Sequence, residues 1–124
     1  MNNQLVKFAI TVKNASAVNK PYVVFHNSKV ILDATKAMYR EGLIQSFTTA
    51  ENKILLKLRS VDGQAVTTFM KLHSKPTNPK YLKYEDLARL NFKRTEAFIS
   101  TSKGVKTLTE CKQKKIGGLF LFTC

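Results

Sequence analysis

The chain has 124 residues, of which 44% are hydrophobic, so it can bury a core as one domain or two small lobes and is not a disordered chain. Its 21 Lys and Arg residues against 8 acidic residues give a net charge of +13. Because such an excess destabilises a compact chain through self-repulsion, it favours a polyanionic partner, above all nucleic acid. The longest apolar run, 119–122, is too short to span a bilayer, which excludes a membrane-spanning role, and the spread of basic residues along the chain argues against a membrane-surface partner.

The first predicted element is a short helix, because four apolar residues recur at helical spacing. These residues are Leu5, Phe8, Ala9 and Val12. Asn2 or Asn3 is the expected N-cap. A loop is then expected over 14–21, followed by a short strand over 22–25.

The segment HNSKVILDATKAMYREG predicts a second helix with both ends marked. Asn27 or Ser28 can cap its N-terminus, and Gly42 stands where a helix needs a left-handed residue to stop. Its predicted buried stripe consists of Ile31, Ala34, Thr35 and Met38.

Three strands are predicted next, over 43–49, 54–58 and 66–72, and the last two alternate between apolar and polar residues. Asp62-Gly63 between them is a turn signal. It either closes a hairpin or forms the hinge between two lobes.

The last third opens with the basic, proline-containing loop SKPTNPKYLK at 74–83, after which 84–90 predicts one or two helical turns. A strand over 97–100 leads into STSKG. Thr107 and Glu110 form a capping box for a short helix that is expected to stop at the glycine pair GG, before a final strand over 119–124.

The sequence offers few arrangements of side chains that could catalyse a reaction or bind a metal or nucleotide. His26 and His73 end predicted strands without a carboxylate beside them, and the acidic residues fall mostly on helix starts and faces. Cys111 and Cys124 lack the paired spacing of a zinc site and are expected to be free thiols. STSKG lacks the glycines that precede GK[ST] in a nucleotide-binding loop. We therefore expect no enzyme activity, no cofactor, no metal and no small-molecule substrate.

Three polar segments are candidates for holding RNA, and each has a plainer reading. Ser28-Lys29 at a helix N-terminus can cradle a phosphate or serve as an ordinary cap. Ser74-Lys75 with Tyr81 combines cations with an aromatic ring, as in loops that hold irregular RNA, or is a solvated connector. STSKG offers three hydroxyls, one cation and a glycine that permits close approach, or is a polar turn.

The order of these motifs resembles one family. ISTSKGV, a short helix and then IGGLFLF resemble the C-terminal half of the bacterial-type and organellar ribosomal small-subunit protein eight family, in which STSKG and a later GG are the hallmark. The resemblance covers nearly the whole chain from Asn14. It includes NSK and REGLI between Val23 and Phe47, Asn19-Lys20, Ser74-Lys75-Pro76, and Tyr81 with Glu85, Asp86 and Leu87.

The resemblance implies an α/β (α+β) fold of two small lobes. An N-terminal α-β-α-β-β lobe, 1–62, would pack on a mostly β C-terminal lobe with one short helix, 63–124, which would bind rRNA. The implied function is that of a structural constituent of the small ribosomal subunit. Such a protein binds the central domain of the small-subunit rRNA, contacts neighbouring small-subunit proteins and supports assembly and translation.

The resemblance also implies an RNA-binding set. In it the hydroxyls and glycine of STSKG approach unpaired bases, Lys103 meets phosphate, and the other lobe contributes Ser28 and Lys29. The implied set is Ser28, Lys29, Ser74, Lys75, Tyr81, Ser100, Thr101, Ser102, Lys103, Gly104, Gly117 and Gly118.

Three departures from the family pattern bear on origin. Leu119 follows the glycine pair where the family has glutamate, Ala15 replaces a glycine, and NQLVK at 3–7 replaces D-P-I-A-D. With residue usage typical of AT-rich coding, they favour a ribosome in the mitochondrial matrix, with a plastid or a bacterial cytoplasm as alternatives. Two other functions stay open: an RNA-binding regulator of a messenger off the ribosome, and a nucleotide-binding enzyme using STSKG.

Overall fold

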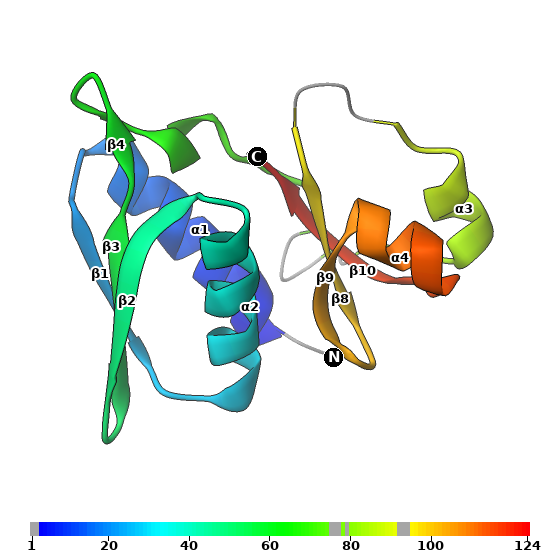
Figure 1. Cartoon of the computed structure of the whole chain (residues 1–124), viewed down its shortest axis with the longest axis horizontal. Coiled ribbons are helices and arrows are strands. Elements are labelled where there is room, and N and C mark those ends of the chain that lie inside the picture. The colour runs from blue at the N-terminus through cyan, green and yellow to red at the C-terminus, as the bar shows by residue number, and fades with distance from the viewer. Residues whose placement is uncertain (1–2, 75–77, 79, 92–94) are drawn as a thin grey trace. The chain divides into compact units, whose positions relative to one another are not determined.

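A computed structural model describes residues 3–74, 78, 80–91 and 95–124 of the chain. It divides the chain into two compact units, Met1–Met70 and Lys71–Cys124 (Figure 1). Helices and antiparallel sheets make up both units, so the predicted α+β class is confirmed. Among the residues described, none of the helices combines the length and apolar character needed to cross a bilayer.

Unit 1 has the predicted α-β-α-β-β order followed by a short hairpin and a 3₁₀ turn. Its elements are α1 (Asn3–Ala17), β1 (Tyr22–His26), α2 (Lys29–Arg40), β2 (Ile44–Ala50), β3 (Lys53–Leu58), β4 (Ser60–Val61), β5 (Gln64–Ala65) and η1 (Val66–Phe69). The main sheet is antiparallel with strand order β1-β3-β2, and α1 and α2 cover one of its faces (Figure 1).

Helix α1 is longer than the sequence predicted, and it takes up the first part of the expected loop. Ala15 and Ser16 are buried, so the helix keeps a packed face beyond Val12. The Ser16 hydroxyl donates to the Val12 carbonyl at 2.8 Å and also contacts the Thr67 hydroxyl of η1. This tertiary contact has no signature in the local sequence. The helix ends where Asn19 adopts φ 56°.

Helix α2 forms as predicted because its signals are local. The Ser28 hydroxyl accepts a hydrogen bond from the Ile31 N–H at 3.2 Å, which caps the N-terminus. Gly42 adopts φ +77° just after the helix. All four predicted stripe residues are buried.

The segment after β3 settles one alternative and corrects one prediction. Asp62-Gly63 closes the β4–β5 hairpin. The strand predicted over 66–72 is wrong, because Val66–Phe69 forms a 3₁₀ turn and the strand β6 covers only Lys71–Leu72. Thr67 and Met70, three residues apart, are the positions that this turn buries. The Thr67 hydroxyl contacts the Ser16 hydroxyl of α1, and η1 belongs to unit 1, which ends at Met70.

Unit 2 is an antiparallel sheet with helices on one face. Its elements are β6 (Lys71–Leu72), β7 (Tyr81–Leu82), α3 (Tyr84–Ala88), β8 (Ala97–Thr101), β9 (Gly104–Thr107), α4 (Leu108–Lys114) and β10 (Gly118–Thr123). The strand order is β6-β10-β8-β9, and β7 pairs with another part of β10. The implied fold had one short helix here, whereas the structure has two, since the helical turns predicted over 84–90 form α3.

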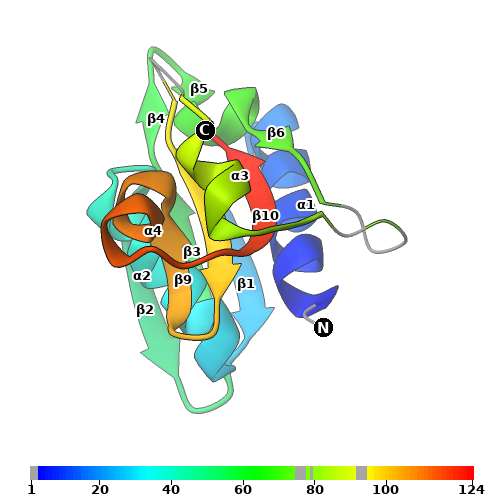
Figure 2. The same cartoon turned by 90° about the vertical axis from the view of Figure 1, so that its right-hand side faces the viewer.

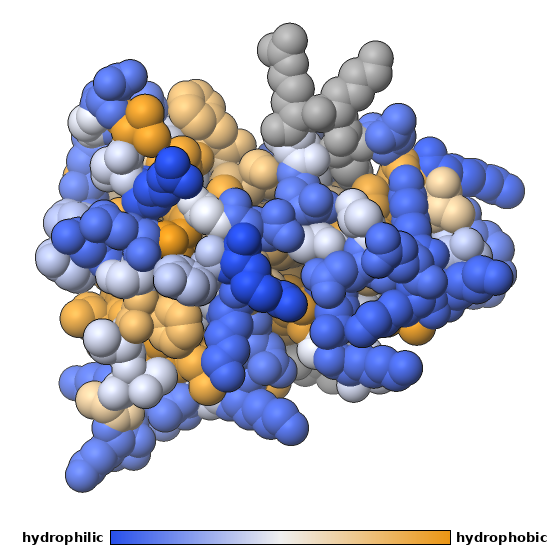
Figure 3. All heavy atoms as spheres, viewed as in Figure 1, coloured by the Kyte–Doolittle hydropathy of each residue, from blue (hydrophilic) through white to orange (hydrophobic). Residues whose placement is uncertain are grey.

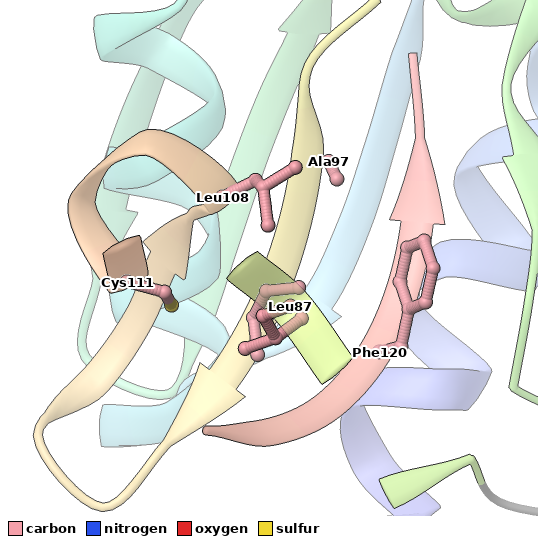
Figure 4. Close-up of a cluster of buried hydrophobic side chains, with 6 residues drawn as sticks. Leu87, Ala97, Leu108, Cys111 and Phe120 are labelled. Carbon is pink, nitrogen blue, oxygen red and sulfur yellow. The ribbon is translucent and has the colours of Figure 1, made fainter. Parts of the chain in front are cut away.

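Side chains from α3, α4 and the strands meet in a core that holds unit 2 together (Figure 4). The core residues are Leu87, Ala97, Ile99, Leu108, Cys111 and Phe120. The predicted capping box is present, since the Thr107 hydroxyl accepts from the Glu110 N–H at 3.3 Å. The sequence predicted that the glycine pair would end α4. In the structure the residue that adopts the left-handed conformation at the end of this helix is Lys115, at φ 56°.

Candidate nucleic-acid interface

The STSKG segment forms the turn of the β8–β9 hairpin. Thr101 pairs with Gly104, which leaves Ser102 and Lys103 at the tip, both exposed. The Thr101 hydroxyl donates to the Gly104 carbonyl at 2.7 Å and accepts from the Lys103 N–H at 3.2 Å. Gly104 adopts φ +106°, a conformation that a side chain would strain. Thr101 and Gly104 therefore shape the turn, and Ser102 and Lys103 are presented by it.

Tyr81 and Ser100 lie in one row of the sheet beside this turn. Leu119 of β10 pairs with Tyr81 on one side and with Ser100 on the other. Opposite residues of antiparallel strands project from the same face, and adjacent strands are about 4.8 Å apart, so the Tyr81 and Ser100 backbones are separated by about 10 Å. The Tyr81 ring is 58% exposed, whereas Leu119 is buried between its two neighbours. An aromatic ring and a hydroxyl thus flank an apolar position.

Gly117 and Gly118 allow the strands that carry this row to approach. A Cβ atom on Gly118 would lie 2.2 Å from the Ser100 carbonyl oxygen, and one on Gly117 would lie 2.5 Å from the Leu82 carbonyl oxygen. Both distances are far inside van der Waals contact. The two glycines, predicted as RNA-binding residues, are therefore explained by close backbone packing within the protein.

Ser74, a member of the predicted set, has a buried side chain. Its hydroxyl donates to the Phe120 carbonyl and accepts from the Lys80 N–H at 3.0 Å. Both bonds tie the segment that enters β7 to β10, so Ser74 positions Tyr81. Lys75 lies outside the described residues.

The remaining predicted pair lies in unit 1, at the start of α2. Ser28 uses one lone pair of its hydroxyl to cap the helix. Lys29 is the first helical residue and its side chain is exposed. The structure thus confirms the cap, and it leaves a lysine beside a helix N-terminus, where backbone N–H groups favour anions.

Positive charge is concentrated in unit 2. Its residues include twelve of the 21 basic and four of the 8 acidic side chains, which leaves a net charge of +8. The exposed cations of its described part are Lys71, Lys80, Lys83, Arg89, Lys103, Lys114 and Lys115. Hydrophilic side chains cover α3, α4 and the β8–β9 hairpin in the space-filling view (Figure 3). Lys80, beside Tyr81, was missed by the sequence analysis although charge and adjacency to an aromatic residue could have indicated it.

The same electrostatics act on the ionisable groups of the unit. Burial, and then the charges of Lys71 and Lys80, lower the pKa of His73 below its ordinary value of 6.5. Burial raises the pKa of the Cys111 and Cys124 thiols to about 11, so both are protonated and poorly nucleophilic at neutral pH.

Two observations concern metal ligands and nucleotide binding. In the part of the chain that the structure describes, three or more His, Cys, Asp or Glu side chains do not gather as they would around a metal ion. The STSKG turn leads from one strand into another, whereas a nucleotide-binding loop leads into a helix whose N-terminus holds the phosphates.

Comparison with known proteins connects these features. Residues 3–124 match the family model described as Ribosomal protein S8. The chain is 31% identical over 122 residues to Small ribosomal subunit protein uS8 of Acholeplasma laidlawii, covering 95% of this chain and 93% of that protein. It is 30% identical to Small ribosomal subunit protein uS8c of Anthoceros angustus, covering 98% and 97%. Small ribosomal subunit protein uS8m of Acanthamoeba castellanii is 30% identical over 99 residues, covering 77% and 78%.

Proposed function

Because the chain belongs to the ribosomal protein S8 family, we propose that it is a structural constituent of the small ribosomal subunit that binds small-subunit rRNA. The resemblance seen in STSKG, the glycine pair and the chain-wide pattern is confirmed by the family match over residues 3–124. The function is one of binding, and its partners are rRNA and neighbouring small-subunit proteins. The +13 charge supplies the attraction that such an RNA partner needs.

The RNA surface that we propose centres on the β8–β9 turn. The observation that carries it is the exposed Ser102-Lys103 tip held by the Thr101 hydroxyl. The Ser102 hydroxyl can donate to and accept from a base edge or a ribose 2′-OH, and Lys103 can neutralise phosphate. The Tyr81 ring, two strands away from Ser100 in the same row of the sheet, offers a face on which a base can stack.

The other residues of the implied set take supporting roles in this proposal. Ser74, Gly117 and Gly118 hold β7, β10 and β8 together, so they shape the surface without touching RNA. Lys75 is proposed on sequence grounds, as a cation beside the same RNA. Ser28 and Lys29 form a separate phosphate contact, made by the N-terminus of α2.

The RNA is proposed to be the central domain of the small-subunit rRNA, in a mitochondrial ribosome. Residue usage typical of AT-rich coding and the drift at Ala15 and Leu119 support the mitochondrial assignment. The relatives include bacterial proteins and the forms named uS8c and uS8m, so a plastid or bacterial ribosome is the competing assignment. Co-sedimentation with small-subunit particles from each purified compartment distinguishes them.

Binding of the protein to a central-domain rRNA fragment tests the proposal. Ser102→Ala removes one hydroxyl contact and should weaken binding by about 1–3 kcal/mol. Lys103→Ala should lower the slope of log K against log salt by about one. Ser46→Ala, at an exposed serine on β2, is the matched control and should leave affinity unchanged. Unchanged affinity for both the Ser102 and Lys103 variants would contradict the proposed surface.

Regulation of a messenger off the ribosome uses the same surface and predicts RNA binding without particle association. Co-sedimentation with small-subunit particles at native expression level separates the two functions. A nucleotide-binding enzyme predicts instead that a calorimetric titration with ATP or GTP gives saturable heat, which Lys103→Ala abolishes.

A further inference from the structure

Strand β1 is an edge of the unit 1 sheet, and its sequence lacks the features that usually protect an edge from pairing with another strand. The sheet order β1-β3-β2 leaves β1 and β2 as edges. The pairing of β2 with β3 is interrupted by a register shift between Ile44 and Ser46, whereas β1 pairs with β3 in continuous register. The sequence of β1, YVVFH, is strongly β-prone and contains no proline, lysine or acid. Edges of this kind are ready to pair with another strand unless something protects them.

The outward backbone groups of β1 can be assigned from its flanking hydrogen bonds. The Leu58 N–H donates to the Pro21 carbonyl at 2.9 Å, and the Asn27 N–H donates to the Asn52 carbonyl at 2.8 Å. Alternation in an antiparallel ladder then directs the N–H and C=O groups of Tyr22, Val24 and His26 away from β3. All three residues are exposed.

Strand β1 and helix α1 lie side by side (Figures 1 and 2), and a groove runs between them along this edge. One hollow of about 610 Å³ is lined by Thr11, Ala15 and Val18 on one side and by Tyr22 and Val24 on the other. A second hollow of about 180 Å³ continues past Phe25 and His26. Both hollows include Thr11, so together they follow the whole of β1. At 3.4 Å per residue, the edge accommodates an extended segment of about five residues.

The charges around the groove identify the chemistry of its occupant. The sequence contains no Asp or Glu between Asn3 and Leu32. Lys20 lines the first hollow and Lys7 lines the second, and the Lys57 ammonium lies 5.8 Å from the Tyr22 ring centroid. The rest of the lining is mainly apolar, and its polar members are Thr11, His26 and the amides of Gln4 and Asn14. A mainly apolar groove, with outward N–H and C=O groups on β1 and a lysine in each hollow, suits an extended peptide with acidic ends.

We propose that β1 is a docking edge for an extended, acid-flanked segment of another protein, which adds a fourth strand to the β1-β3-β2 sheet. Alternate side chains of that segment contact Thr11, Ala15 and Val18, and its glutamates or aspartates meet Lys7 and Lys20. A second copy of this chain is disfavoured, because pairing two β1 edges brings two sets of these lysines together. RNA phosphates can contact the lysines, but RNA does not pair with a row of strand N–H and C=O groups as a peptide backbone does. The inference is independent of the RNA surface proposed for unit 2.

The test uses the full chain and synthetic peptides. The probe is a nine-residue peptide of alternating valine and threonine with two glutamates at each end; its counterparts carry lysines at the ends or N-methyl groups on alternate amides. We expect the acidic peptide to slow amide hydrogen exchange at Tyr22, Val24 and His26 at least tenfold at saturation. The lysine peptide should bind at least tenfold more weakly, and the N-methylated peptide should not bind.

Two substitutions at one position separate backbone pairing from side-chain contact. Val24→Pro removes an outward N–H without touching the β1–β3 hydrogen bonds, and should weaken binding at least tenfold. Val24→Thr keeps the N–H and should bind normally; thermal unfolding followed by circular dichroism checks that both variants fold. Absence of saturable binding by the acidic peptide to the unsubstituted chain overturns the proposal. So does equal binding by the acidic and N-methylated peptides, protection of the same amides by self-association without peptide, or tighter protection by oligouridine.

Discussion

The close approach of β10 to β8 at Gly118 makes Gly118→Ala the most informative single substitution. The added Cβ would lie 2.2 Å from the Ser100 carbonyl oxygen, whereas a carbon and a carbonyl oxygen normally stay about 3.3 Å apart or more. The strands must therefore separate by about 1 Å at this point. No flexible side chain can relieve the contact, since the oxygen belongs to the backbone.

The expected cost follows from that separation. Overpacking of this kind costs about 1–3 kcal/mol, and two weakened ladder hydrogen bonds add about 0.5–1.5 kcal/mol each. Alanine also lowers the conformational entropy of the unfolded chain, which offsets about 0.4–1 kcal/mol of this cost. Gly118→Ala should therefore lower the free energy of unfolding of unit 2 by about 3 kcal/mol. RNA affinity should fall with it, because the same separation moves Ser100 away from Tyr81.

Urea unfolding measures this effect if the two units are observed separately. Far-UV circular dichroism follows the whole chain, and the amide NMR signals of β8 report on unit 2. Gly63→Ala is the matched control: a Cβ there meets nothing within 4 Å, so only the φ of +78° opposes it, at about 1 kcal/mol. If Gly118→Ala costs no more than the control, the strand contact does not restrict this position and the reasoning fails.

Two further predictions concern the residues that hold β7 and β6 to β10. Ser74→Ala removes the donor to the Phe120 carbonyl and the acceptor of the Lys80 N–H, and should cost about 1–3 kcal/mol in urea unfolding; a cost below about 0.5 kcal/mol would contradict a positioning role. The lowered pKa of His73 means that the unfolded chain binds a proton more readily than the folded chain. Its contribution to stability should be complete above about pH 6.5 and decline as pH falls through the folded pKa, and in His73→Gln thermal melts this part of the pH dependence should disappear.

The helices α2 and α4 show what could be predicted from the sequence. A serine cap, a stripe of apolar residues and a glycine at positive φ are all local, so α2 was predicted with its ends. The capping box of Thr107 and Glu110 works in the same way. The family resemblance extended these local signals to the whole α+β topology, since STSKG and the glycine pair occur at family spacing.

Long-range contacts decided the features that the sequence analysis missed. The alternation over 66–72 suits a strand, but bonding of Thr67 to Ser16, 51 residues earlier, favours a 3₁₀ turn and lengthens α1. Ser74 belongs to a loop whose composition is typical of RNA contacts. Only the tertiary structure shows that its hydroxyl donates to the Phe120 carbonyl of β10.

The sequence by itself therefore determined the chemistry of the protein: a basic chain, a hydroxyl-rich turn and a family that works with RNA. The tertiary structure decided which of those side chains reach the surface. Ser102 and Lys103 reach the surface because the Thr101 hydroxyl closes the turn that carries them. Gly117 and Gly118 instead allow neighbouring backbone segments to approach closely. The physical reason is that exposure and close approach depend on which strands pair, and pairing joins residues that the linear sequence keeps far apart.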